Sequence, residues 1–509
     1  MASIFQSFPI LRRAAPRLSR EFFTCQVCAK ASPPPGLRPQ FKSIRQTPFL
    51  RAFRSQTTQV PKHVVDNKTS PLGALSGTIG VKSTVSGANP KSNSFPEISD
   101  KAVAYWLLGS AASVFGIVVF GGLTRLTESG LSITEWRPVT GSLPPMNTED
   151  WEAEFSKYRS SPEFALLNPN MTLPEFKQIF WMEWGHRLWG RIIGVTFVLP
   201  TIYFIARRRV SIPMAWKLIG ICGLIGFQGV IGWWMVKSGL HDDLFAPGSH
   251  PRVSQYRLAT HLGAAFIVYT TMLLSGLSIL RERSLLANPE AALKLLATLK
   301  HPNLRVFRRC VTALSILVFV TAMSGALVAG LDAGLIYNEF PYMGVGLTPP
   351  KKELFDPFYS HVPDQSDLWW RNMLENPSLV QLDHRILAMT TFTAVMSIFA
   401  YSRYSSRVRT TLPANAKKGV TGTVHLVWMQ AALGISTLIY LVPTWLAATH
   451  QAGSLALLTG VLVLGSRVSM PRRAVRLVQQ AVKSQPTGAS ASGKRGVGLG
   501  IGGIEQKRV

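Results

Sequence analysis

Eight apolar runs, each about twenty residues long, constrain the fold of this chain more than any other feature of its sequence. A helix of roughly 20 apolar residues is long enough to cross the hydrocarbon core of a bilayer. The runs occupy residues 103–123, 186–206, 218–236, 258–280, 311–331, 384–401, 420–441 and 445–464. Only 16% of the 509 residues are charged, as expected for a protein that is mostly buried in lipid. We therefore predict an all-α polytopic membrane protein with eight transmembrane helices.

The first sixty residues have a different composition from the rest. They contain ten Lys and Arg residues against one acid, Glu21, with Ser and Thr between them and no apolar core. This composition is typical of a mitochondrial presequence. We predict that residues 1–60 are a presequence rather than a basic tail that binds nucleic acid, and that the Ser-, Gly-, Pro- and Lys-rich residues 61–100 are a flexible linker.

The charges in the connecting segments predict the orientation. The short connections at 207–217 and 402–419 contain Lys and Arg but no acid, whereas the two long polar segments, which follow the first and fifth runs, lean acidic. Lys and Arg stay on the side from which a membrane protein is inserted. We expect both termini in the mitochondrial matrix and both long segments in the intermembrane space.

An internal repeat divides the membrane region in two. Four landmarks recur in the same order: 123–131 with 327–335, His186-Arg187 with His384-Arg385, Gln228 and Gly232 with Gln430 and Gly434, and 258–261 with 447–450. Four spans return the chain to its starting side, so both halves have the same topology. We predict two pseudo-symmetric four-helix bundles, at 101–281 and 307–467, with a matrix loop at 282–306 and a matrix tail at 468–509.

Each half has one histidine at the start of its second helix and one near the start of its fourth. These are His186 and His261, and then His384 and His450. The two helices of a half run in the same direction, so their imidazoles lie at similar depth. A lone histidine is more often a hydrogen-bonded core residue, but four at repeat-equivalent positions favour ligation. Facing histidines in a four-helix bundle can clamp a haem iron from both sides.

The halves differ three residues before the first histidine, where Glu183 in one half corresponds to Gln381 in the other. A haem with two histidine ligands has no free iron position and suits electron transfer or storage. A carboxylate beside it adds a general base or a charge that stabilises a developing cation. An acid near a helix start can also be purely interfacial. We predict that Glu183 is catalytic and that the first half is the reacting one.

The motifs E-W-G-H-R at 183–187, L-A-T-H at 258–261, D-H-R at 383–385 and A-T-H at 448–450 resemble those of the haem A synthase family. The resemblance covers about residues 100–467. It implies an oxidoreductase of the mitochondrial inner membrane that converts the C8 methyl group of haem O to a formyl group. The implied route is two hydroxylations and loss of water from the diol, giving haem A for cytochrome c oxidase.

The resemblance also implies roles for residues and partners. His186 and His261 match positions that hold the substrate haem, His384 and His450 match those that hold a haem b, and Glu183 matches the required carboxylate. A matrix ferredoxin and a haem O-forming prenyltransferase are the implied partners. Bacterial relatives often carry a cysteine pair in the first external segment, but residues 124–180 contain no cysteine. Any mechanism that depends on such a pair is therefore in doubt here.

Three arginines are candidates to bind haem propionates: Arg125, Arg187 and Arg385. Guanidinium pairs bidentately with carboxylate, although each arginine could equally lie at the interface with its charge turned to water. The competing function is a di-haem b-type electron carrier of the membrane, in which haem is never a product. A transporter built from repeats fits less well, because the best-matched residues are imidazoles rather than broken helices. The oligomeric state stays open, a homo-oligomer included.

Overall fold

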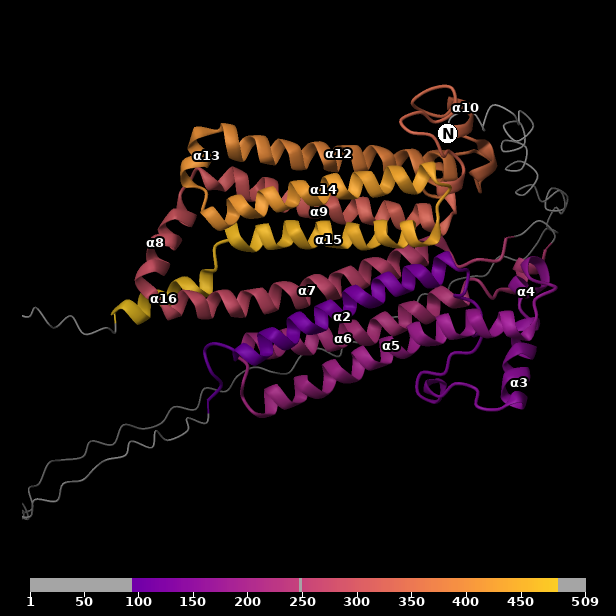
Figure 1. Ribbon diagram of the computed structural model, residues 1–509, viewed down its shortest axis with the longest axis horizontal. Coiled ribbons are helices and arrows are strands. Elements are labelled where there is room, and N and C mark those ends of the chain that lie inside the picture. The colour runs from indigo at the N-terminus through magenta and orange to yellow at the C-terminus, as the bar shows by residue number, and fades with distance from the viewer. Residues whose placement is uncertain (1–93, 247–249, 484–509) are drawn as a thin grey trace, which may run out of the picture. The chain divides into compact units, whose positions relative to one another are not determined.

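The structure is a computed structural model in which residues 94–246 and 250–483 are described (Figure 1). The predicted presequence, most of the predicted linker and the end of the predicted tail lie outside these residues. The part that is described is helical and forms no strand. The eight helices that are long and apolar enough to cross a membrane are α2 (Lys101–Leu126), α5 (Leu173–Ala206), α6 (Ile212–Lys237), α7 (Gln255–Ala287), α9 (Leu304–Gly330), α12 (Pro377–Tyr404), α14 (Ala414–Ile439) and α15 (Thr444–Val468). The predicted fold class and the eight spans are confirmed.

Helix α5 is longer than the apolar run it contains. It begins with a capping box, in which the Thr172 backbone N–H donates to Glu175 Oε2 at 2.8 Å, and Pro174 occupies its first turn. It then continues without a break for 34 residues. The residues that precede the second predicted span are therefore part of the same helix, so that Glu183 and His186 are held on one rigid element.

The spans pack in two groups of four (Figure 1). In the first group α2 packs against α5, α5 against α6, α6 against α7, and α7 against α2. In the second group α9, α12, α14 and α15 pack in the same cyclic order. Contacts of α7 with α9 and of α15 with α2 join the groups. The two four-helix groups are thus present, and a pseudo-symmetry operation between them stays a prediction.

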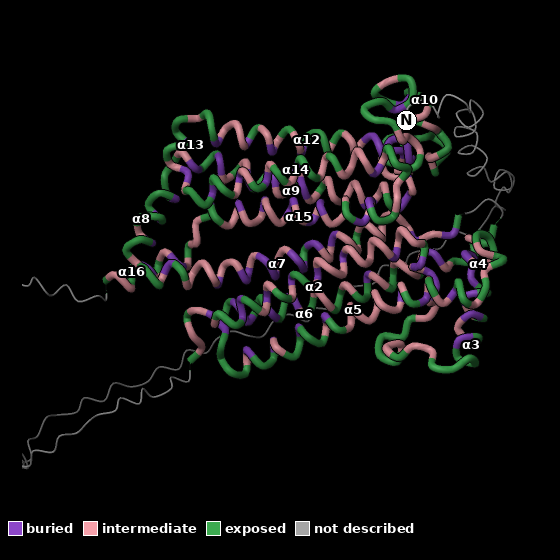
Figure 2. The backbone as a smooth tube through the Cα atoms, in the orientation of Figure 1, coloured by how far each residue is buried: buried purple, intermediate pink, exposed green. Residues whose placement is uncertain are grey.

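Burial along the spans agrees with a membrane environment (Figure 2). Half of the apolar window of α7 is buried, because this helix packs against both groups, whereas only 11% of the window of α6 is buried. Large apolar side chains such as Trp216, Phe227 and Val230 on α6 are exposed. Exposed apolar residues on a helix whose backbone is satisfied internally suit contact with lipid.

The connections at the two ends of the bundle contain helices of their own. The first long segment forms α3 (Thr148–Arg159) and α4 (Pro162–Leu167), and the second forms α10 (Lys351–Leu354) and α11 (Leu368–Glu375). At the opposite end lie α8 (Pro289–Lys300), α13 (Ser406–Thr411) and α16 (Arg472–Lys483). The segment predicted as a loop at 282–306 is therefore largely helical. The predicted tail begins with α16, which packs its Ala474 and Val478 onto α7 and α8.

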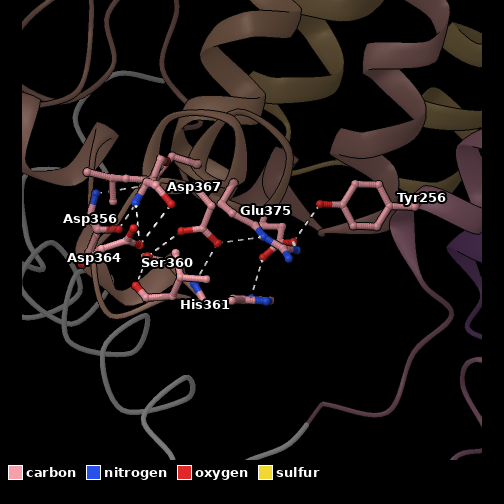
Figure 3. Close-up of polar contacts among 12 residues, drawn as sticks. Tyr256, Asp356, Ser360, His361, Asp364, Asp367 and Glu375 are labelled. Carbon is pink, nitrogen blue, oxygen red and sulfur yellow. Dashed lines mark hydrogen bonds and ion pairs between the residues drawn. The ribbon is translucent and has the colours of Figure 1, made fainter. Parts of the chain in front are cut away.

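A polar network ties the second long segment to α7 (Figure 3). The hydroxyl of Tyr256, at the start of α7, donates to Glu375 Oε1 on α11 at 2.8 Å. Glu375 also pairs with Arg371 and lies 3.2 Å from His361 Nε2. Because Tyr256 precedes His261 by little more than one helical turn, this network anchors the end of α7 that carries the histidine.

Candidate functional site

The four predicted histidines lie inside the two helix groups. His186 on α5 and His261 on α7 belong to the first group, and His384 on α12 and His450 on α15 belong to the second. In each group the two helices stand across the ring from each other. The imidazoles therefore come from opposite helices of the same bundle, and their binding of a haem stays a prediction.

A glycine on a flanking helix stands directly behind each imidazole. A methyl group added at these glycines would lie 2.7–3.0 Å from the Cε1 atom of the adjacent histidine: Gly121 with His186, Gly232 with His261, Gly325 with His384, and Gly434 with His450. Real Cβ atoms are essentially never found under 3.0 Å, so the rings of His186 and His450 occupy space that glycine leaves free. At Gly232 and Gly325 the contact of 3.0 Å is tighter than nine in ten real ones, and the ring would have to shift by a few tenths of an ångström. Gly232 and Gly434 were landmarks of the repeat. Gly121 and Gly325 were missed, although the alignment of 123–131 with 327–335 also pairs them.

The histidine nitrogens suit a metal that has most of its ligands from a macrocycle and needs few from the protein. Nδ1 of His186 and Nδ1 of His450 are buried without a hydrogen-bond partner. No cluster of three or more His, Cys, Asp or Glu side chains that could hold a bare metal ion occurs in residues 94–246 and 250–483. Haem needs only two axial protein ligands, because the macrocycle supplies the other four. Two imidazoles from opposite helices of a four-helix group fit the two axial positions of a haem in each half.

Glu183 is buried, with only 3% of its surface exposed, and every donor around it is aimed at its carboxylate. Ser132 Oγ and the Ile133 backbone N–H donate to Oε2 at 2.7 and 2.8 Å. Arg187 donates to Oε1 through Nε at 3.0 Å and through Nη2 at 2.6 Å. Four donated bonds, two of them from a guanidinium, hold the carboxylate oxygens in place. The geometry therefore suits a carboxylate fixed in position rather than a freely moving general base.

The second half keeps this arrangement without the acid. Gln381 is buried, and its Nε2 donates to the Tyr337 carbonyl at 3.0 Å. Arg385 Nη2 donates to the same carbonyl at 2.9 Å, as Arg187 Nη2 donates to that of Ile133 at 2.8 Å. Ile133 and Tyr337 are equivalent in the repeat. The predicted difference between Glu183 and Gln381 thus lies beside an arginine whose bond to the neighbouring carbonyl is the same in both halves.

A model of the cytochrome oxidase assembly protein family (COX15-CtaA) matches residues 104–462, well over half of the chain. The chain belongs to this family. The matched region contains Glu183 and all four histidines, and it confirms the resemblance found in the sequence motifs.

Three relatives in the family show how far the similarity extends. A protein named heme A synthase COX15 from Saccharomyces cerevisiae is 52% identical over 75% of this chain and 78% of its own length. Its namesake from Homo sapiens is 45% identical over 72% of this chain and 82% of its own. A heme A synthase–mitochondrial ferredoxin fusion protein from Schizosaccharomyces pombe is 51% identical over 78% of this chain and 65% of its own.

The three arginines predicted to bind propionates all have protein partners in this family member. Arg125 Nη2 donates to both carboxylate oxygens of Asp332, at 2.8 and 2.9 Å, and so joins the two helix groups. Arg187 uses Nε, Nη1 and Nη2 within the protein, while the guanidinium of Arg385 bonds two carbonyls and leaves Nε without a partner. Propionate binding stays a prediction for all three, and Arg187 would have to exchange bonds to accomplish it.

Glu163 on α4 is a second buried acid near the first-half site, and sequence reasoning missed it. It is 4% exposed, and its Oε2 has no hydrogen-bond partner. Burial, followed by the nearby charges of Glu183 and Glu128, raises the pKa of Glu163 to about 8. An acid in the first turn of a short helix gives no sequence signal of burial, because such acids usually stabilise the helix start from the surface.

Replacing Glu163 by Gln should remove a pH-dependent cost to stability. Because the folded protein keeps the proton up to about pH 8 while the unfolded chain releases it near 4.5, the free energy of unfolding falls as the pH rises between these values. The fall is about 1.4 kcal/mol per pH unit for one group. The midpoint temperature of thermal unfolding of the purified protein should therefore fall more toward pH 8 in the wild type than in Glu163→Gln. Glu152→Gln, which changes an exposed acid, is the control. An equal dependence of the unfolding temperature on pH in the wild type and both variants would contradict the raised pKa of Glu163.

Proposed function

We propose that this protein is a haem A synthase of the mitochondrial inner membrane, an enzyme of haem A biosynthesis. It oxidises the C8 methyl group of haem O to a formyl group. Two successive hydroxylations give a hydroxymethyl group and then a diol, which loses water. The names of the relatives support this function, and the observation that carries it is the carboxylate of Glu183, which stands beside one histidine pair where the other pair has the neutral Gln381.

The first half would bind the substrate, haem O. His186 and His261 approach from opposite sides of the bundle and would fix the plane of the macrocycle between them. Glu183 would place a permanent negative charge beside it, held by Ser132 and Arg187. A charge set in advance in a site without water stabilises positive charge that develops during oxidation and needs no reorganisation.

The second half would bind a resident haem b. His384 and His450 are its ligands, and Gln381 provides no charge that would favour oxidation. Bound there, haem b supplies one-electron transfer. Arg385 fixes the start of α12 to the carbonyls of Tyr337 and Tyr342 and so holds the ligand helix in place.

The partners and orientation follow from the same assignment. The relative from Schizosaccharomyces pombe is named as a fusion with a mitochondrial ferredoxin, which supports a ferredoxin-type electron partner. The acid-free basic connections support an orientation with both termini in the matrix, where such a partner would act. A prenyltransferase that forms haem O must act before this enzyme, because haem O is the substrate.

The proposal is tested by extracting the haems from protein expressed with a source of haem O. We expect haem b, together with haem A and its hydroxylated precursor. His261→Ala should lose haem A and keep haem b, whereas His384→Ala should lose the haem b signal. Recovery of haem b alone from the wild type would favour a di-haem electron carrier and reject the synthase.

A further inference from the structure

The histidines that begin the two halves have different neighbours on the first helix of their half. Ser324 on α9 lies beside His384, with 2.8 Å between Oγ and Nδ1. The repeat-equivalent residue on α2 is Phe120, whose ring stacks near His186 with the centroids 6.4 Å apart and 13° between the planes. His186 Nδ1 has no hydrogen-bond partner. Both neighbours directly precede the glycines behind the imidazoles, Gly121 and Gly325.

The direction of the serine bond follows from its second contact. Ser324 Oγ donates its proton to the Thr321 carbonyl at 2.8 Å, so the oxygen is left to accept from His384 Nδ1–H. A proton on Nδ1 leaves the lone pair of Nε2 free to bind iron. Such a bond fixes the tautomer and the ring orientation and makes the imidazole a stronger donor to the metal.

The histidines on the fourth helices have no comparable hydroxyl in the part of the chain that is described. Nδ1 of His450 has no hydrogen-bond partner. Nδ1 of His261 lies 3.2 Å from Gln228 Nε2, an amide nitrogen that already donates to the His261 carbonyl at 2.8 Å and cannot accept a proton. Among the four ligands, His384 thus has the side-chain acceptor that strengthens an axial ligand.

We propose that Ser324 is a positioning residue that makes the second-half haem a tightly held centre of lowered potential, and that Phe120 leaves the first-half haem exchangeable. This inference rests on the proposed function, in which one haem stays and the other must enter as substrate and leave as product. A stronger imidazole donor stabilises ferric over ferrous iron and slows ligand loss. The exchange of a serine for a phenylalanine at one repeat position gives the two halves these opposite properties.

The test is the midpoint potential of the haem b retained by purified Ser324→Ala, measured by spectroelectrochemistry. We expect it to rise, by up to the 59 mV that corresponds to a tenfold change in the ferric-to-ferrous ratio of a one-electron couple. Ser324→Thr, which keeps a hydroxyl, should restore the wild-type value. Ser315→Ala is the matched control, because Ser315 is on the same helix and bonds only the Val311 carbonyl. A midpoint in Ser324→Ala equal to that of Ser315→Ala would overturn the role of Ser324.

The converse variant is Phe120→Ser. The measurement is the rate of haem transfer from the purified protein to an excess of apo-globin. The kinetic phase that is absent in His261→Ala reports the first-half haem. This phase should be at least threefold slower in Phe120→Ser than in the wild type. An unchanged or faster phase would overturn the role of Phe120. Failure of the proposed function gives a different result, since the wild type would then yield haem b alone, without haem A or its hydroxylated precursor, whatever the midpoint potential of Ser324→Ala.

Discussion

Replacing Glu183 by Gln will reduce formation of haem A by about 100-fold or more while both haems remain bound. Glutamine has nearly the same shape, so Ser132 and the Ile133 N–H keep an acceptor, but the negative charge is lost. Removing one preorganised electrostatic group from an active site typically costs 10²–10³-fold, roughly the loss expected here. The measurement is the ratio of haem A to haem O in extracts, normalised to the haem b retained by the second half.

Two further variants separate charge from structure. Glu183→Asp keeps the charge but draws it back from Arg187, so it should retain more activity than Glu183→Gln. Glu152→Gln removes an exposed acid on α3 and should have no effect on haem A formation. If Glu183→Gln gave the wild-type haem A ratio, Glu183 would be only an anchor for Arg187 and the 132–133 backbone.

The spans could be predicted from local sequence, and the four histidines could be singled out as candidate ligands from the repeat. An apolar run of bilayer length has few alternatives to a transmembrane helix, since its backbone must be satisfied internally. The histidines stood out because the repeat compares each with a second copy at the same helix position. The same comparison placed Glu183 against Gln381, and the structure supports it with equivalent arginine bonds to Ile133 and Tyr337.

What could not be predicted depends on how the long segments fold back onto the helices. No spacing rule brings Ser132 to a residue 51 positions later, and none buries Glu163 beside the same site. Arg125 was interpreted as a candidate partner of a haem propionate or an interfacial arginine, but Asp332 reaches it from the other half. Asp332 and Glu128 share a left-handed backbone conformation, with φ of 52° and 51°, at repeat-equivalent turns. The repeat thus extends to backbone geometry that residue types alone did not reveal.

Replacing Gly434 by Val will remove haem b from the second half, with an expected loss of at least about tenfold in occupancy. A Cβ at this position already lies 2.8 Å from His450 Cε1, and the added methyl groups take more of the same space. The ring must turn away, and an axial ligand loses its bond to iron when its nitrogen moves by a few tenths of an ångström from a distance near 2 Å. The measurement is the haem b content per protein by pyridine haemochrome.

The control is Gly422→Val on the same helix, where an added Cβ meets nothing within 4 Å. Both variants carry the same cost in helix propensity, so a difference between them reports the space behind His450 rather than the helix. Gly434→Ala should fall between them, because it adds the Cβ alone. Equal haem b content in Gly434→Val and Gly422→Val would mean that the imidazole has room to move without losing iron. The four glycines would then be a consequence of close helix packing, and the histidine pairs would be held in place by the α12 and α15 backbones instead.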